Sequence, residues 1–137
     1  MEEALIAYQA RLAGDATLAS MITSFNGAPA VFIGRVPEGA SMPFIVITGP
    51  VSDLPRDDKG SKQGRELLLD FRVTMRASGS TKQVSLAGGR MRELLHRSAV
   101  AVAGYTPVYE EALGPVYDNQ DDMYSMVLSL RVQLGSS

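Results

Sequence analysis

The chain has 137 residues, of which 45% are hydrophobic and 20% are charged, and its formal net charge is −2. This length fits one domain, 1–137, and the composition is typical of a folded globular protein rather than a disordered one. The 13 basic residues do not outnumber the 15 acidic ones, which disfavours a protein that coats nucleic acid. The absence of cysteine excludes disulfides, thiolate metal sites and a cysteine nucleophile.

The N-terminal segment MEEALIAYQARLAG is acidic and amphipathic, without the basic start and apolar stretch of a secretory signal peptide. No apolar run approaches the roughly 18 residues that a membrane-spanning helix needs. We therefore expect synthesis in the cytoplasm and no membrane partner.

The first third of the chain predicts two helices and two strands. Leu5, Tyr8 and Leu12 recur at three- and four-residue spacings, which indicates an amphipathic helix over 2–13 that ends at Gly14. Asp15 can cap a second helix over 16–25, which the segment NGAPA ends. Strands are expected over 30–36 and 44–48; the second is apolar on both faces and suggests a strand covered from both sides.

Residues 53–66, DLPRDDKGSKQGRE, form a polar segment between two apolar ones. We considered a phosphate-binding loop, a nucleic-acid arm, a linker between domains and a hairpin tip that contacts a partner. The phosphate loop fails because no glycine lies five positions before Gly60 and a strand rather than a helix follows. The segment is expected to be a long polar hairpin loop within the single domain.

The rest of the chain predicts a strand over 66–76, a helix, and two strands over 106–118 and 123–134. The strands 66–76 and 123–134 alternate, with one apolar face each and a mainly polar second face on which Leu68 and Val127 are the exceptions. The helix begins at Ser80 or Thr81, and its glycines Gly88 and Gly89 are expected to let it approach the sheet closely. The predicted fold is α+β, with a mainly antiparallel sheet of about five strands, helices packed on one face, and the order α-α-β-β-β-α-β-β.

Candidate catalytic groups are few. His96 is the only histidine, which excludes a metal site built on two histidines, and its place at the basic end of a helix favours a structural role. Acidic clusters occur at Asp57–Asp58, Glu110–Glu111 and Asp118/Asp121/Asp122. They lack the pattern of a calcium-binding loop, so solvated surface charge is the favoured interpretation. No catalytic, cofactor-binding or metal-binding residue is predicted, although an enzyme that uses His96 with an acidic cluster remains an alternative.

Several stretches taken together carry a family resemblance: LIAYQARLAGDATLASMI, VFIGRVPEGASMPFIVITGPVSD, GRELLLDFRVTMRASGSTKQVSLAGGRMRELLH and MYSMVLSLRVQL. In this order and spacing, which cover nearly the whole chain, they resemble the phage tail-completion or tail-terminator proteins of the DUF3168 type. Such proteins come from long-tailed phages and from phage-derived particles such as gene transfer agents.

The resemblance implies a structural virion protein without enzymatic activity or cofactor. It implies a homo-oligomeric ring, commonly hexameric, that caps the tail tube at the head–tail junction and joins it to the head connector. The implied partners are further copies of the chain, the tail tube protein, the connector protein and DNA in transit through the lumen. A head-completion or connector protein of the same particle is the alternative, and a small ligand-binding domain a weaker one.

The polar segment differs from the corresponding loop of that family, which often carries aromatic residues, so its contacts cannot be transferred from relatives. Its charges are balanced, four acidic and four basic, and balanced charge suits contacts between repeated subunits. We therefore expect an arm that becomes ordered beside neighbouring subunits. The candidate interface residues are Arg56, Asp57, Asp58, Lys59, Lys62, Arg65, Glu66, Arg72 and Arg76; of these, Arg56, Arg65, Arg72 or Arg76 could also face DNA.

Overall fold

The computed structural model describes residues 2–57, 63–76, 81–97, 100, 102–120 and 123–136. In this part of the chain there are three helices, α1 (Glu2–Ala13), α2 (Ala16–Ala19) and α3 (Thr81–Leu95). Strands β1 (Ser24–Phe25) and β2 (Ala28–Pro29) form a small antiparallel sheet. The main sheet has the strand order β3-β4-β5-β7-β6 and consists of β3 (Val31–Ile33), β4 (Phe44–Asp57), β5 (Gln63–Arg76), β6 (Tyr105–Gln120) and β7 (Met123–Ser136).

The strand directions contradict the expected fold. β4, β5, β7 and β6 pair antiparallel, but β3 runs parallel to β4 and pairs Val31–Ile33 with Ile45–Ile47. The prediction of a five-strand, mainly antiparallel architecture is therefore wrong: the described residues form seven strands in two sheets, one of them mixed, in the order α-α-β-β-β-β-β-α-β-β.

The second predicted helix is also wrong, for a local reason. Its helical part ends at Ala19, and Phe25 pairs with Ala28 across a two-residue turn. Asn26 and Gly27 form that turn with φ values of 51° and 81°. Asn-Gly readily adopts this left-handed conformation and is a strong hairpin signal, which here overrides the helical spacing of the residues before it.

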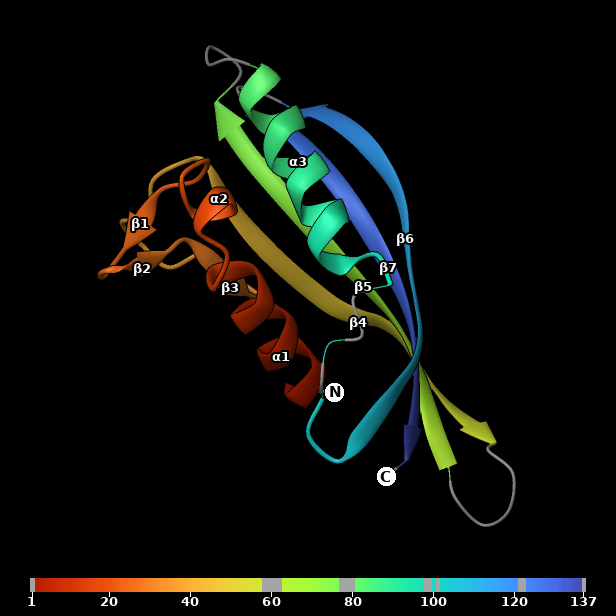
Figure 1. Cartoon of the computed structure of the whole chain (residues 1–137). Coiled ribbons are helices and arrows are strands. Elements are labelled where there is room, and N and C mark those ends of the chain that lie inside the picture. Colours follow the sequence, from red (N-terminus) through yellow and green to blue (C-terminus); the bar gives the residue numbers. More distant parts are fainter. Residues whose placement is uncertain are drawn as a thin grey trace.

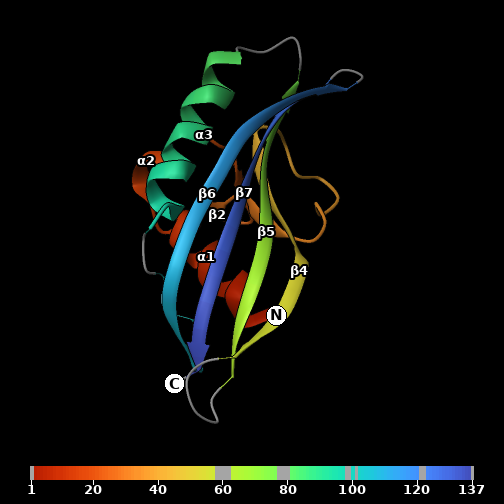
Figure 2. The ribbon, with the colours of Figure 1, turned by 90° about the vertical axis from the view of Figure 1, so that its right-hand side faces the viewer.

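The helices form one layer on the main sheet. α1 contacts β3 and β4, α3 contacts β5, β6 and β7, and α1 and α3 contact each other; Figures 1 and 2 show them together on one face. None of the described helices combines the length and the apolar character that crossing a membrane would require.

The core lies between this helix layer and the face of the sheet that it covers, here called the inner face. Tyr8 of α1 is fully buried and meets Phe71 of β5 edge to face, with ring centroids 6.0 Å apart. The apolar faces predicted for strands 66–76 and 123–134 are confirmed. Apart from the partly buried Tyr124, the side chains of these faces are all buried: Leu67, Leu69, Phe71, Val73 and Met75 in β5, and Met126, Leu128, Leu130, Val132 and Leu134 in β7.

The two central glycines of α3 have different surroundings. A Cβ at Gly88 would overlap the Sδ and Cε atoms of Met126, which is buried in β7. A Cβ at Gly89 would meet nothing within 4 Å. The prediction of a close approach to the sheet is therefore confirmed for Gly88 and wrong for Gly89.

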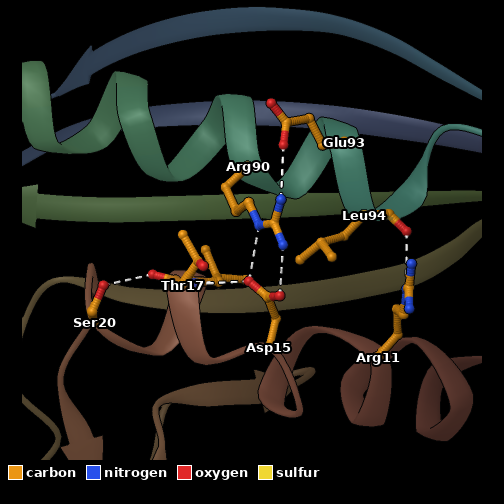
Figure 3. Close-up of polar contacts among 8 residues, drawn as sticks. Arg11, Asp15, Thr17, Ser20, Arg90, Glu93 and Leu94 are labelled. Carbon is orange, nitrogen blue, oxygen red and sulfur yellow. Dashed lines mark hydrogen bonds and ion pairs between the residues drawn. The ribbon is translucent and has the colours of Figure 1, made fainter.

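Polar contacts fasten the first two helices to α3 (Figure 3). Arg90 donates two hydrogen bonds to the Asp15 carboxylate, at 2.9 Å from Nε and 2.7 Å from Nη2, while Asp15 also accepts the Leu18 N–H at 2.8 Å as the cap of α2. The hydrogen bonds from Arg90 and from the Leu18 N–H lower the pKa of Asp15 to about 2. Arg11 of α1 donates to the Leu94 carbonyl at 3.2 Å. The helix layer is thus held by charge-assisted hydrogen bonds as well as by apolar packing.

Candidate assembly surface

The face of the main sheet opposite the helices, here called the open face, carries alternate residues of its four long strands. Strand register places Val46 beside Arg72, Arg72 beside Val127, and Val127 beside Val116. Side chains stay on one face at every second position, which defines the set: Phe44, Val46, Thr48 and Leu54 from β4; Glu66, Leu68, Asp70, Arg72 and Thr74 from β5; Tyr109, Glu111, Leu113 and Val116 from β6; Ser125, Val127, Ser129, Arg131 and Gln133 from β7.

Polar side chains on the open face are hydrogen-bonded to one another. Arg131 Nε lies 2.7 Å from the Glu66 carboxylate, and the Ser129 hydroxyl donates to Asp70 at 2.7 Å. The Tyr109 hydroxyl donates to Glu111, and this hydrogen bond raises the pKa of Tyr109. The open face therefore presents a polar network of both signs rather than a field of one sign.

Apolar side chains interrupt this network. Val116 is 65% exposed, and Leu113 and Leu54 are also exposed. Exposed apolar side chains beside polar ones, on a sheet face that the chain leaves uncovered, suit a protein–protein contact. Together with the paired charges, this makes the open face the candidate assembly surface.

A shallow pocket of about 220 Å³ lies at one end of this face. It is lined by Val36, Phe44, Val46, Thr48, Arg72, Thr74, Met123 and Ser125. The floor contains Thr74 and Ser125, each 5% exposed, whose hydroxyl oxygens are 3.2 Å apart. The pocket therefore has apolar walls and a hydroxyl floor, with a guanidinium among its lining groups.

The predicted interface residues that the structure describes are spread along β4 and β5. Arg56 and Asp57 lie in β4, opposite Gly64 and Gln63 of β5, so the strands extend further into the polar segment than expected. The ends of β4 and β5 that carry this segment point away from the helices (Figure 1). Asp58, Lys59 and Lys62 lie outside the described residues.

The remaining predicted residues lie along β5. Arg65 and Glu66 are neighbours in the strand and so point to opposite faces. Arg72 lies on the open face, three alternate positions from Glu66, and Arg76 is opposite Met123 at the end of the strand. Of the nine predicted residues, Glu66 and Arg72 are the two whose described side chains share the open face.

His96 and Glu110, which were candidate catalytic groups, both make structural contacts. His96 accepts a hydrogen bond at Nδ1 from the Ala112 N–H, at 3.1 Å, which is a structural contact between α3 and β6. Glu110 is 3% exposed and accepts hydrogen bonds from the Tyr8 hydroxyl at 2.8 Å and the Val100 N–H at 3.1 Å. Burial, followed by the nearby Glu110 carboxylate, raises the pKa of Tyr8.

The interpretation of the Glu110–Glu111 pair as solvated surface charge is therefore wrong for Glu110. Its partner Tyr8 is 102 residues away in the chain, so no local sequence pattern indicates this contact. Asp118 lies in β6, while Asp121 and Asp122 fall outside the described residues. The described residues contain no group of three acidic, histidine or cysteine side chains placed to hold a metal ion.

The two long edges of the main sheet are partly closed. At the β6 edge, both polar groups of the Ala112 backbone are hydrogen-bonded to side chains. Arg92 of α3 donates to the Ala112 carbonyl at 2.8 Å, and the Ala112 N–H donates to His96, which directly follows α3. At the opposite edge, β4 continues beyond the last β3 pairing at Ile47, and this part contains Pro50 and Pro55. Proline lacks the N–H group that an added strand would need.

Comparison with known proteins gives a consistent assignment. The chain has the fold of a chain from the virion of a native gene transfer agent particle, with a TM-score of 0.76 and 22% sequence identity over 95% of this chain and 92% of that one. A second solved chain matches with a TM-score of 0.64 and 12% identity, over 97% of this chain and 94% of that one. No protein of curated function matches significantly. Residues 7–134 match the family described as tail completion protein gp17, a structural family of phage tails, and the chain belongs to that family.

Proposed function

We propose that the chain is a tail terminator: a non-enzymatic virion protein whose copies form a hexameric ring at the head–tail junction. In this proposal the ring caps the tail tube, contacts the tail tube protein on one side and the head connector protein on the other, and lets DNA pass through its lumen. The family match supports the tail-completion part of the proposal. The likeness to a virion chain shows the shared fold.

The open face is the observation that supports assembly most directly. It leaves Val116, Leu113 and Leu54 exposed on the same face as the Arg131–Glu66 ion pair and the Ser129–Asp70 hydrogen bond. A heterologous contact in which this face meets a different surface of the next copy would close into a ring if the rotation allows it. Exposed apolar groups with mixed charge suit such a repeated contact better than they suit a solvated surface.

The proposal is tested by particle size in solution and by electron microscopy of the purified protein, alone and with tail tubes. Wild-type protein should form rings or bind tube ends, and Val116→Asp should abolish both by placing a charge on the open face. Ile6→Asp is the matched control, because Ile6 is 53% exposed on α1, away from the sheet. A monomer that binds neither tube nor connector would refute the proposal, while binding to the connector alone would favour a head-completion protein.

We further propose that residues 53–66 contact neighbouring subunits through their balanced charges. Hydrogen exchange in the free and the assembled protein tests this contact. Backbone amides of 53–57 and 63–66 should exchange more slowly after assembly, and equal protection in the two states would count against the arm.

A further inference from the structure

The side of α3 that faces away from the sheet carries a row of exposed residues, here called the outer stripe. It consists of Lys82, Leu86, Gly89 and Glu93, which follow one another at intervals of four, three and four residues. Residues at these intervals lie on one side of a helix. All four are exposed, and the large apolar side chain of Leu86 is 52% exposed. The outer stripe is therefore open to contact from outside the chain.

Gly89 in the outer stripe is not explained by packing within one copy. In the interior of a helix, glycine is about 1 kcal/mol less favourable than alanine. A Cβ at Gly88 would overlap Met126, but a Cβ at Gly89 would meet nothing within 4 Å. Glycine is the usual residue where another group must come close to the backbone. The lack of a side chain at Gly89 thus leaves a recess about one helical turn from the exposed Leu86 side chain.

The outer stripe is complementary to itself when a second α3 lies against it in the opposite direction. With two-fold symmetry about the middle of the stripe, Leu86 of each copy faces Gly89 of the other. In the same arrangement, Lys82 of each copy faces Glu93 of the other. The spacing of the four residues is that of the a and d positions of a heptad, whose side chains insert between those of the facing helix. Leu86 would then fill the recess, flanked by two pairs of opposite charge.

The charges favour the antiparallel direction over the parallel one. In a parallel pair in the same register, Lys82 would face Lys82 and Glu93 would face Glu93, and like charges repel. The Glu93 side chain is 68% exposed, and one of its oxygens accepts a hydrogen bond from Arg90 at 2.8 Å (Figure 3). A carboxylate can accept from a second donor as well. Within one copy Lys82 and Glu93 are about 16 Å apart along the helix, so they can pair only between copies.

We propose that the outer stripe of α3 binds the outer stripe of a second copy of the chain, antiparallel and with two-fold symmetry. This contact goes beyond the proposed ring, because α3 covers the inner face of the sheet and leaves the open face uncovered (Figures 1 and 2). Two short helices bury less than the roughly 800 Å² per partner of a standard interface. The dimer is therefore weak, with a Kd of about 0.1–1 mM, and the chain is monomeric at this contact in dilute solution.

Sedimentation equilibrium of the full chain with Val116→Asp, the variant expected to block ring formation, tests the dimer. Between about 10 µM and 1 mM, the mass should rise from one copy towards two. Leu86→Asp should weaken the dimer at least tenfold, because it places a charge at the centre of the contact. In NMR spectra of the same chain, the amide signals of Ser85 and Gly89 should shift as the concentration rises.

Reversal of the charges tests the direction of the two helices. Lys82→Glu and Glu93→Lys should each weaken the dimer about tenfold, because each replaces two pairs of opposite charge with two pairs of like charge. The double variant Lys82→Glu/Glu93→Lys should restore the dimer, since opposite charges then face each other again. Glu38→Lys is the matched control for Glu93→Lys: it makes the same change of charge at an exposed residue between β3 and β4 and should leave the dimer unchanged.

Two results would overturn the proposal: a mass of one copy throughout the concentration range, or a double variant as weak as the single ones. The charge variants keep the test decisive if Leu86→Asp does not fold. The dimer and the ring can also fail separately. Rings whose Gly89 signal does not respond to concentration refute only the dimer, and dimers of a chain that forms no rings and binds no tube refute only the ring.

Discussion

Substitutions at Gly88 and Gly89 allow the effect of α3 packing on the free energy of unfolding to be measured at two adjacent positions. Replacing either glycine by alanine within a helix should gain about 1 kcal/mol of stability, since alanine has the higher helix propensity. At Gly89 nothing opposes this gain, so Gly89→Ala should raise the free energy of unfolding by about 0.5–1 kcal/mol. At Gly88 the new methyl group would overlap the end of the Met126 side chain, which is 1% exposed.

The cost at Gly88 follows from the surroundings of Met126. The thioether end can move, but only within a close-packed core, and overpacking of this kind costs about 1–3 kcal/mol. After the propensity gain, Gly88→Ala should lower the free energy of unfolding by about 0–2 kcal/mol, leaving the two variants about 1–3 kcal/mol apart.

Urea unfolding followed by far-ultraviolet circular dichroism measures both variants, provided that the slopes with denaturant agree. In a Met126→Ala background the overlap is gone, and Gly88→Ala should then stabilise the protein as much as Gly89→Ala does. Equal effects of the two substitutions in the wild-type background, within about 0.3 kcal/mol, would refute the assignment of Gly88 as the point of closest approach.

Three further predictions concern polar contacts. Asp15→Asn keeps the cap of α2 but removes the charge that faces Arg90. The pKa of Asp15 falls from 3.8 to about 2 on folding. The stabilising contribution of the Asp15 carboxylate is therefore present above pH 4 and lost as the pH falls through 2. The stability difference between wild type and variant should therefore shrink between pH 4 and pH 2 and vanish below pH 2 in an acid denaturation series, and a constant difference would contradict the ion pair. Tyr8→Phe should cost about 1–3 kcal/mol, since it leaves a buried carboxylate short of a donor, whereas Tyr109→Phe should cost less than Tyr8→Phe, because the Tyr109–Glu111 hydrogen bond lies on the open face. His96→Ala should lower the free energy of unfolding by about 1 kcal/mol and leave ring formation unchanged in light scattering; loss of a measurable activity would instead support the enzyme alternative.

The sequence predicted the parts of the fold that depend on local pattern. Alternation along β5 and β7 correctly identified the buried side chains such as Phe71 and Leu128, because a strand repeats every two residues whatever its partners are. The parallel pairing of β3 was missed because three apolar residues carry no information on the direction of their neighbour.

Errors at the candidate site have similar causes. Polarity in residues 53–57 and 63–66 predicts a loop, but polar residues can still form strands when their backbones pair, as Arg56 does with Gly64. Glu110 could not be placed because its partner is distant in the chain. The pocket was not predicted, since Val36, Phe44 and Met123 come together only through the topology.

The partly closed edges of the main sheet have a consequence for a protein made in many copies before its particle is complete. A long strand with free N–H and C=O groups is a template on which further chains can add, and such growth leads to fibres. Arg92 and His96 occupy the backbone of Ala112 on one edge, and Pro50 and Pro55 interrupt the donors on the other. Copies that await assembly should therefore resist fibrillation at high concentration. They are left to associate through contacts between side chains, whose angle can close a ring after a fixed number of subunits.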